Sequence, residues 1–231
     1  MKVALISDIH ANIFALNAVY ADLNKEKVDF ILVAGDLIGY YYWPKEVVNL
    51  LRNDNRVICI RGNHENILLE TLLSDEKAKF YRKKYGSGYD ICHEKLNDDD
   101  IRWLTTLPEN IQLDIDGCTF YMSHGSLMEI DDYLYPDASS ECMKKNYSDC
   151  KVTLFGHTHY PFVHTHENKI MINPGSVGQP RDIGGLASYV IVNTKNFVTR
   201  FKRIMFDYSQ ITKTAKFKDR ELEYLWKIMS R

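Results

Sequence analysis

Five short apolar segments, each followed by polar residues or glycine, constrain the fold of this chain more than any other feature. They are rich in valine, isoleucine and phenylalanine, and they lie at residues 3–7, 30–34, 57–60, 119–123 and 152–155. Continuous apolar runs of this length are typical of strands that are buried on both faces of a sheet. The pattern therefore predicts buried strands whose ends carry polar groups.

Amphipathic segments separate the first three of these strands. The segment at residues 12–27 carries its large apolar side chains on one helical face: Ile13, Leu16, Val19, Tyr20 and Leu23. Pro44 begins a second predicted helix, because proline is favoured in the first turn of a helix. An alternation of strands and helices predicts βαβ units with parallel strands.

The second half of the chain has a different pattern. Residues 65–107 are predicted to be mostly helical, and Asp116-Gly117 forms the two-residue turn of a predicted hairpin. The chain is then strand-like from about residue 150 to 206, and an amphipathic helix is predicted over residues 219–229. We expect a mainly antiparallel half after the βαβ half, with two packed sheets covered by helices.

The composition excludes several classes of protein. A chain of 231 residues can form one sizeable domain, and a net charge of −2 gives no indication of a nucleic-acid-binding surface. No apolar run approaches the roughly 20 residues that cross a bilayer, and the N-terminus does not resemble a secretory signal. The five cysteines show no CxxC spacing, which indicates reduced thiols and predicts a cytoplasmic protein.

The polar residues after the five strands are the candidate functional residues. They comprise three Asp or Asn side chains and five histidines: Asp8, His10, Asp36, Asn63, His64, His124, His157 and His159. Ligands of open α/β sheets bind beyond the carboxyl ends of the strands. Burying such groups without partners costs several kcal/mol, roughly 2–7 for each group. A metal site at this edge would satisfy them.

These segments resemble the five sequence motifs of the calcineurin-like metallophosphoesterases. Asp8-x-His10, Gly35-Asp36, Gly62-Asn63-His64-Glu65, His124 and Gly156-His157-Thr158-His159 match them in order and spacing. Residues 173–182 (NPGSVGQPRD) resemble a segment of the small bacterial and archaeal phosphodiesterase branch. The resemblance implies an α/β fold, a four-layer αββα sandwich of two mixed sheets. We expect one domain over residues 1–231, with a helical cap-like segment at about 66–106.

The resemblance also implies a dinuclear metal centre. Asp8, His10 and His159 would bind one ion, Asn63, His124 and His157 the other, and Asp36 both. The nitrogen and oxygen ligands, without a thiolate, argue against a structural zinc site. Manganese is the first expectation, with Fe, Ni, Zn or Mg as alternatives. His64 is the expected catalytic residue, because histidine titrates near neutral pH.

The expected activity is hydrolysis of phosphodiester bonds in nucleotide-like or other small phosphodiesters. In this hypothesis a hydroxide activated by the two metals attacks phosphorus in line, and His64 assists the leaving group. A phosphomonoesterase or dinucleoside polyphosphate hydrolase on the same site is an alternative. A non-catalytic scaffold, like a retromer subunit of the family, is a weaker one, because every expected ligand is present. The expected partner is a small phosphoester, with neither membrane nor nucleic acid.

Two side-chain groups allow more than one interpretation. Tyr41, Tyr42 and Trp43 could stack on a nucleobase, although packing against the 66–106 helices is favoured. Arg181 could bind a substrate phosphate, or it could form a surface ion pair with Asp182 or another carboxylate.

The second His-Thr-His triplet, His164-Thr165-His166, is interpreted as part of a solvated hairpin without a metal.

Overall fold

Three parallel strands from the start of the chain lie at the centre and one edge of the first sheet. In the computed structural model, which describes residues 1–231, its strand order is β10-β9-β1-β2-β3. The strands are β1 (Lys2–Ile6), β2 (Phe30–Ala34), β3 (Val57–Ile60), β9 (Leu186–Asn193) and β10 (Thr199–Met205). The predicted parallel pairing of β1, β2 and β3 is confirmed. The antiparallel pair β9 and β10 completes this sheet, so the second half of the chain contributes strands to both sheets.

The second sheet has the order β4-β5-β6-β8-β7. Its strands are β4 (Asn110–Ile115), β5 (Cys118–Ser123), β6 (Val152–Leu154), β7 (Phe162–His166) and β8 (Lys169–Asn173). Strands β5, β6 and β8 are parallel, and the two edge strands are antiparallel to their neighbours. Asp116 and Gly117 join β4 to β5 with φ of 57° and 75°, as a two-residue hairpin turn requires.

Side chains of β1 alternate between two hydrophobic cores. Val3 and Leu5 belong to the core between the sheets, together with residues such as Phe120 of β5. Ala4 and Ile6 belong to a larger core between the first sheet and its helices. The apolar run of β1 is continuous because both faces of the strand are buried.

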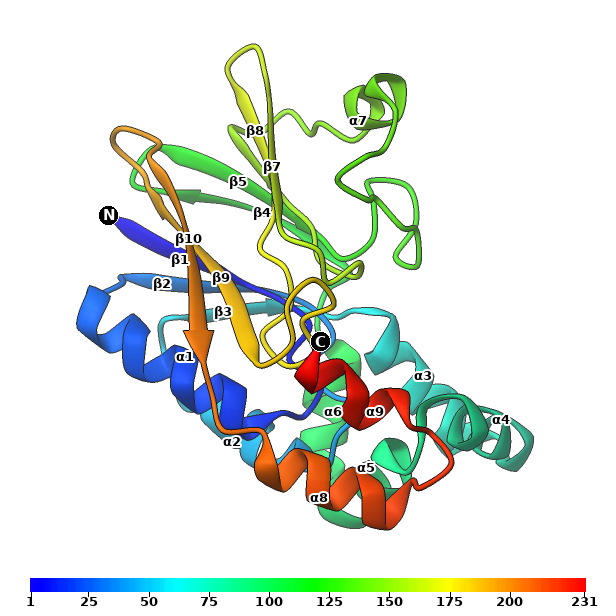
Figure 1. The fold of residues 1–231 in the computed structure, drawn as a ribbon. Coiled ribbons are helices and arrows are strands. Elements are labelled where there is room, and N and C mark those ends of the chain that lie inside the picture. The colour runs from blue at the N-terminus through cyan, green and yellow to red at the C-terminus, as the bar shows by residue number, and fades with distance from the viewer.

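Helices cover the outer faces of both sheets. Figure 1 shows α1 (Ile13–Glu26), α2 (Pro44–Arg52) and α8 (Ser209–Lys218) on the first sheet, away from the second. The predicted apolar face of α1 is buried there through Leu16, Val19 and Leu23. The short helix α7 (Ser140–Lys145) covers the second sheet, where its Met143 packs on Phe155. The predicted arrangement of two mixed sheets flanked by helices is confirmed.

The segment predicted to be helical contains four helices. They are α3 (Asn63–Leu73), α4 (Asp75–Tyr85), α5 (Gly88–Lys95) and α6 (Asp98–Thr106). In Figure 1 they lie beside the first sheet, at the end opposite the N-terminus.

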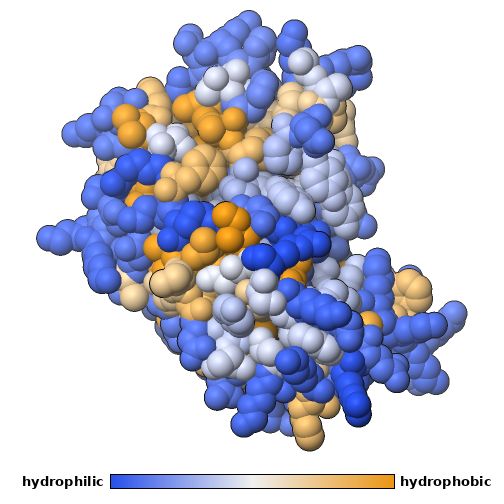
Figure 2. Space-filling view, viewed as in Figure 1, coloured by the Kyte–Doolittle hydropathy of each residue, from blue (hydrophilic) through white to orange (hydrophobic).

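None of the helices combines the length and the apolar composition that a membrane span requires. The face in Figure 2 carries hydrophobic residues in small patches between hydrophilic ones.

The prediction of one helix over residues 219–229 is wrong. Helix α8 ends at Lys218, and only α9 (Tyr224–Lys227) and a 3-10 turn (Ile228–Ser230) follow. The reason is the buried side chain of Asp219, which accepts hydrogen bonds from the Ser87 N–H at 2.9 Å and the Tyr42 hydroxyl at 2.9 Å. These distant partners fix the chain where local periodicity favours a helix.

Candidate metal centre

The carboxyl ends of β1, β2, β3, β5 and β6 meet at one edge of the two sheets. The segments after these strands bring the eight predicted site residues together. Seven of the eight are buried: Asp8, His10, Asp36, His64, His124, His157 and His159. The eighth, Asn63, is half-buried at the start of α3. The structure therefore brings all eight predicted site residues together at one edge.

Five of these residues have a left-handed backbone. Their φ angles lie between 50° and 66°, at Asp8, His10, Asp36, His157 and His159. Side chains rarely adopt this conformation, which costs of order 1–3 kcal/mol for each residue. Backbone strain of this kind is concentrated at functional sites, where the surrounding structure imposes it.

Two glycines allow the chains to approach one another at the site. A Cβ atom on Gly62 would lie 2.2 Å from Asp36 Oδ1, and one on Gly156 would lie 2.0 Å from Ser7 Oγ. A larger residue at position 62 would also lie 2.6 Å from the Asp36 backbone nitrogen, and one at position 156 would displace the side chain of Ser7. This explains why glycine precedes both Asn63 and His157 in the sequence.

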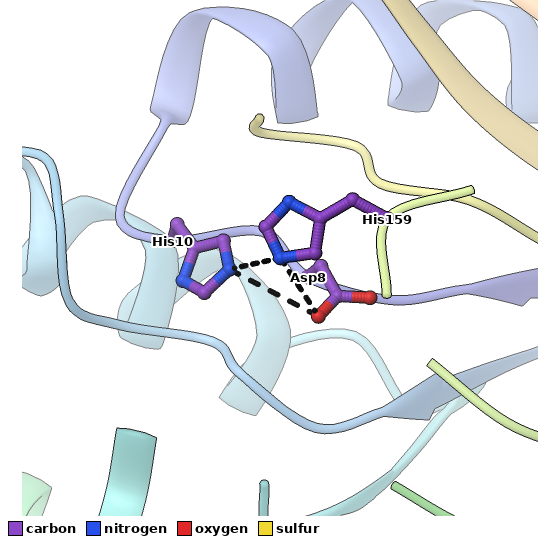
Figure 3. A group of neighbouring side chains, drawn as sticks. All are labelled: Asp8, His10 and His159. Carbon is purple, nitrogen blue, oxygen red and sulfur yellow. Dashed lines mark hydrogen bonds and ion pairs between the residues drawn. The ribbon is translucent and has the colours of Figure 1, made fainter. Parts of the chain in front are cut away.

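Asp8, His10 and His159 form the first ligand cluster, shown in Figure 3. His10 Nε2 lies 3.0 Å from His159 Nε2, which lies 3.4 Å from Asp8 Oδ1. The Nδ1 atoms of the two histidines contact the backbone carbonyls of Ile38, at 3.1 Å, and Gln179, at 2.7 Å. A carbonyl only accepts hydrogen bonds, so each Nδ1 carries a proton.

The protonation states in this cluster favour the binding of a cation. Burial holds the pKa of both His10 and His159 well below its ordinary value, so both rings are neutral. Their Nε2 lone pairs therefore face each other and the side chain of Asp8. Fixing the protonated nitrogen by a carbonyl is the usual arrangement behind a metal-binding histidine.

Asn63, His124 and His157 form a second cluster. His124 Nε2 lies 3.1 Å from Asn63 Oδ1 and 3.2 Å from His157 Nδ1. The other ring nitrogen of His124 lies 2.6 Å from the carbonyl oxygen of Ala34 and donates to it. As in the first cluster, Nδ1 carries a proton and Nε2 faces the centre.

Asp36 lies between the two clusters. Its Oδ2 is 3.7 Å from His10 Nε2 and 3.2 Å from His124 Nε2, while its Oδ1 accepts the His64 backbone N–H at 2.9 Å. Burial alone would lower the pKa of His124, but the Asp36 carboxylate raises it to about 10. Burial raises the pKa of Asp8 to about 7. Two buried carboxylates in one crevice require positive charge, so the donor set fits divalent metal ions.

His64 is adjacent to the clusters but has a different partner. Its Nδ1 lies 2.6 Å from the Tyr89 hydroxyl, and its Nε2 lies 4.0 Å from Asp36 Oδ2. Burial lowers the pKa of His64 to about 4, so its ring is neutral near pH 7. When the hydroxyl of Tyr89 donates to Nδ1, the ring proton is on Nε2, facing the centre.

Sequence reasoning missed several residues that support the centre. Tyr89, on α5, carried no signal linking it to His64. Asp131 Oδ1 lies 3.5 Å from His157 Nε2, in a segment without a motif. The motif residue Glu65 had no assigned role, yet its carboxylate accepts the N–H groups of Gly62, at 2.7 Å, and Leu37, at 2.9 Å. It thereby ties the loop after β2 to the start of α3.

The structure decides between the two interpretations of the aromatic segment. Tyr41 is fully buried and donates to the carbonyl of Leu225 at 3.2 Å, and Tyr42 is buried beside Asp219. Trp43 packs on Phe14 with ring centroids 4.7 Å apart. These residues therefore belong to the core, where Tyr41 and Tyr42 contact the C-terminal segment, and do not offer a stacking surface.

Arg181 does not pair with its neighbour. Asp182 forms its ion pair with Arg203 at 2.9 Å, whereas Arg181 donates to the Tyr40 hydroxyl at 3.3 Å. The Tyr40 ring lies 4.6 Å from the ring of His10, centroid to centroid. Burial, and after it the charge of Arg181, lowers the pKa of His159. Arg181 thus stands at the centre as a cation without a carboxylate partner.

The second His-Thr-His triplet lies in the hairpin of β7 and β8, as predicted. His164 Nδ1 is 2.6 Å from the Tyr147 hydroxyl, and His166 packs against the same ring. Neither histidine joins a group of three or more metal-ligating side chains.

Comparison with known proteins identifies the family. Residues 1–196 match the model of the calcineurin-like phosphoesterase superfamily domain, and the chain belongs to this superfamily. It is 35% identical to an uncharacterized protein of Methanocaldococcus jannaschii, over 91% of this chain and 92% of that protein.

Solved structures show the same fold. A metallophosphoesterase from Sphaerobacter thermophilus has a TM-score of 0.80 and 27% identity, covering 100% of this chain and 99% of that one. A hypothetical protein from Pyrococcus horikoshii has a TM-score of 0.86 and 21% identity, covering 100% and 98%. A structure described as a novel archaeal phosphodiesterase has a TM-score of 0.53 and 20% identity, covering 88% and 100%. The chain thus has the fold and the candidate ligands of a metal-dependent phosphoesterase.

Proposed function

We propose that this protein hydrolyses phosphodiester bonds of small, nucleotide-like substrates at a dinuclear metal centre. The observation that carries the proposal is the position of Asp36 Oδ2, 3.7 Å from His10 Nε2 in one cluster and 3.2 Å from His124 Nε2 in the other. A carboxylate oxygen shared by two clusters suits a bridging ligand. The fold shared with an archaeal phosphodiesterase supports the choice of diesters.

The two clusters would hold different ions. Asp8, His10 and His159 would bind one, Asn63, His124 and His157 the other, and Asp36 both, with manganese the first choice. Two bound ions would supply Lewis-acid stabilisation of the phosphoryl oxygens and lower the pKa of an attacking water. The surrounding structure imposes the left-handed backbone conformation of five of these residues, which supports a site that is positioned before an ion binds.

His64 would act on the substrate and not as a ligand. Its neutral ring donates a hydrogen bond from Nε2 toward the leaving or phosphoryl oxygen, while Tyr89 holds Nδ1 at 2.6 Å. Tyr89 belongs to α5, so the cap-like helical segment would position the His64 ring. The segment and the metal centre would then be parts of a single domain. Arg181 would bind a non-bridging phosphoryl oxygen, because a guanidinium matches phosphate geometry.

The test combines metal content with hydrolysis. The metal-free protein is loaded with Mn, Ni, Mg or Zn and assayed with an aryl phosphodiester, the matching monoester and a dinucleoside polyphosphate. We expect two ions per chain and faster hydrolysis of the diester. Asp36→Asn and His157→Asn should bind fewer ions and lose at least about 10- to 100-fold in activity, since even the outer-shell partners of metal ligands contribute that much.

His164→Asn is the matched control, because this histidine lies outside the centre, and it should behave as the wild type. Full activity of Asp36→Asn would contradict the proposal. Monoester turnover far above diester turnover would reverse the choice of substrate, and no turnover with any metal would favour a scaffold.

A further inference from the structure

A row of tyrosines leads from the metal centre across the segment between β5 and α7. The ring of Tyr133 lies 4.1 Å from the ring of His157. Tyr135 stacks on Tyr133, with centroids 5.8 Å apart and an interplanar angle of 14°. Tyr160, the residue after His159, lies 6.0 Å from Tyr135. One end of the row therefore contacts the candidate centre at His157, and the other end follows His159 in the sequence.

The tyrosines are accessible, yet the segment that carries them is held in place. Tyr133 is 55% exposed and Tyr135 is 39% exposed, whereas Leu134 between them is only 2% exposed. Leu134 packs with Met143 of α7 in the core on the outer side of the second sheet. Anchoring Leu134 leaves the rings on both sides of it facing solvent. Figure 1 shows this segment rising beside the second sheet.

Hydrogen bonds fix the start of the same segment. The Ser126 hydroxyl accepts the Glu129 N–H at 3.0 Å and donates to Asp132 Oδ2 at 2.8 Å. Asp132 directly precedes Tyr133. A surface held in one conformation before binding loses less conformational entropy when a ligand arrives. The rings thus form a preorganised aromatic surface.

The row borders a hollow of suitable size and chemistry. The hollow has a volume of about 470 Å³ and is lined by Tyr135, Pro136, Asp137 and Tyr160. This volume falls within the roughly 300–1,000 Å³ of small-molecule sites. Two tyrosine rings and a proline provide apolar walls, and the Asp137 carboxylate is a hydrogen-bond acceptor. The negative charge of Asp137 disfavours a phosphate here, whereas an uncharged ring with N–H groups is suited to it.

We propose that Tyr133, Tyr135 and Tyr160 bind a planar aromatic ester substituent of the substrate, of which a nucleobase is the main biological form. The inference rests on the proposed phosphoesterase function and assigns the surface that binds the aromatic part of the substrate. The phosphoryl group lies at the metal centre, with Arg181, and the aromatic substituent extends along the tyrosines. Stacking on tyrosine accepts any base, because every base has a π face.

Binding to the metal-free protein tests the inference without relying on activity. Calorimetry compares adenosine 5′-monophosphate with ribose 5-phosphate, which lacks the base. We expect the nucleotide to bind about 5- to 150-fold more tightly, the range given by stacking one base. Equal affinities would overturn the inference. Phenyl phosphate is the third ligand. Tight binding of it indicates that the tyrosines accept aryl groups in general, whereas weak binding indicates that they require a nucleobase.

Variants assign the effect to the row. Tyr135→Ala should lower the affinity for the nucleotide to that for ribose 5-phosphate, whereas Tyr135→Phe, which keeps the ring, should retain it. Phe217→Ala is the matched control, because Phe217 is an exposed aromatic residue on α8 (85% exposed). Unchanged binding by Tyr135→Ala would refute the role of the row.

The outcomes separate the two proposals. Ester hydrolysis without preference for aromatic substituents overturns this inference and leaves the proposed function. If the protein binds the base but hydrolyses no ester with any metal, the proposed function is overturned and the aromatic binding surface remains.

Discussion

The chemistry of the centre depends on where each histidine keeps its proton. Backbone carbonyls of Ile38, Ala34 and Gln179 accept from Nδ1 of His10, His124 and His159 respectively. These three carbonyls thus keep a proton on Nδ1 of each ring and turn Nε2 inward. His157 is the exception, since its Nδ1 faces the centre and its Nε2 lies toward Asp131. Loss of carbonyl or carboxylate partners of this kind typically lowers metal affinity or activity by about 10- to 100-fold.

Arg181 is the residue-scale test of phosphate binding. Arg181→Ala is expected to raise KM for a phosphoester by about 10- to 100-fold, because a hydrogen bond to a charged group contributes about 1.5–3 kcal/mol. Arg181→Lys should restore part of this loss, since the charge remains but the planar fork does not. Steady-state kinetics of the metal-loaded wild type and variants measure these KM values. Arg220→Ala, an exposed site after α8, is the control. An unchanged KM in Arg181→Ala would exclude the role.

Helix α5 acts on the site through one buried hydrogen bond. Gly88 begins the helix against Tyr40, where an added Cβ would lie 2.9 Å from the Tyr40 nitrogen. This close packing brings the next residue, Tyr89, to His64 at 2.6 Å. The cap-like helices are therefore coupled to the orientation of the proposed catalytic group.

Tyr89→Phe tests this coupling at the scale of the element. Loss of one hydrogen bond, worth about 1 kcal/mol, should lower kcat about 5- to 10-fold while KM stays nearly constant. Tyr81→Phe on α4 is a matched control, because its hydroxyl donates to Glu70 at 3.0 Å and not to His64. An equal decrease in both variants would indicate a general loss of structure. A purely structural role for Tyr89 would lower the thermal midpoint and leave kcat unchanged.

At the scale of the molecule, an ion-pair network joins the first helix to the last strand. Glu26 of α1 contacts Arg200 at 2.7 Å and Lys202 at 2.9 Å, both on β10. Hydrogen bonds from Lys202 and Arg200 lower the pKa of Glu26 from 4.5 to about 2. The network connects segments that are more than 170 residues apart in sequence.

The stability of the whole fold should depend on this network in a defined pH range. The pKa of Glu26 is lowered in the folded state, so its contribution is present above pH 4.5 and is lost as the pH falls through about 2. Glu26→Gln should therefore unfold at lower urea than the wild type at pH 7, and the two should converge near pH 2. Glu221→Gln, an exposed site, should match the wild type throughout. A difference that persists at pH 2 would contradict the assignment.

Much of the fold could be predicted because its signals are local. The apolar runs of β1, β2 and β3, the apolar face of α1 and the Asp116-Gly117 turn each depend on neighbouring residues. The prediction failed at residues 219–229, where the local pattern favours a helix but Asp219 bonds to Tyr42, 177 residues away. The pairing of β9 with β1 likewise has no local signal.

The sequence by itself determined which polar residues gather at one edge, because each follows a strand and parallel strands end on the same side. Only the tertiary structure decided what surrounds them. Tyr89, 25 residues from His64, and the row from Tyr133 to Tyr160 meet the centre through packing of separate loops and helices. The partners of buried polar groups and aromatic rings come from segments that are distant in the sequence. The periodicity of a single segment therefore does not predict them.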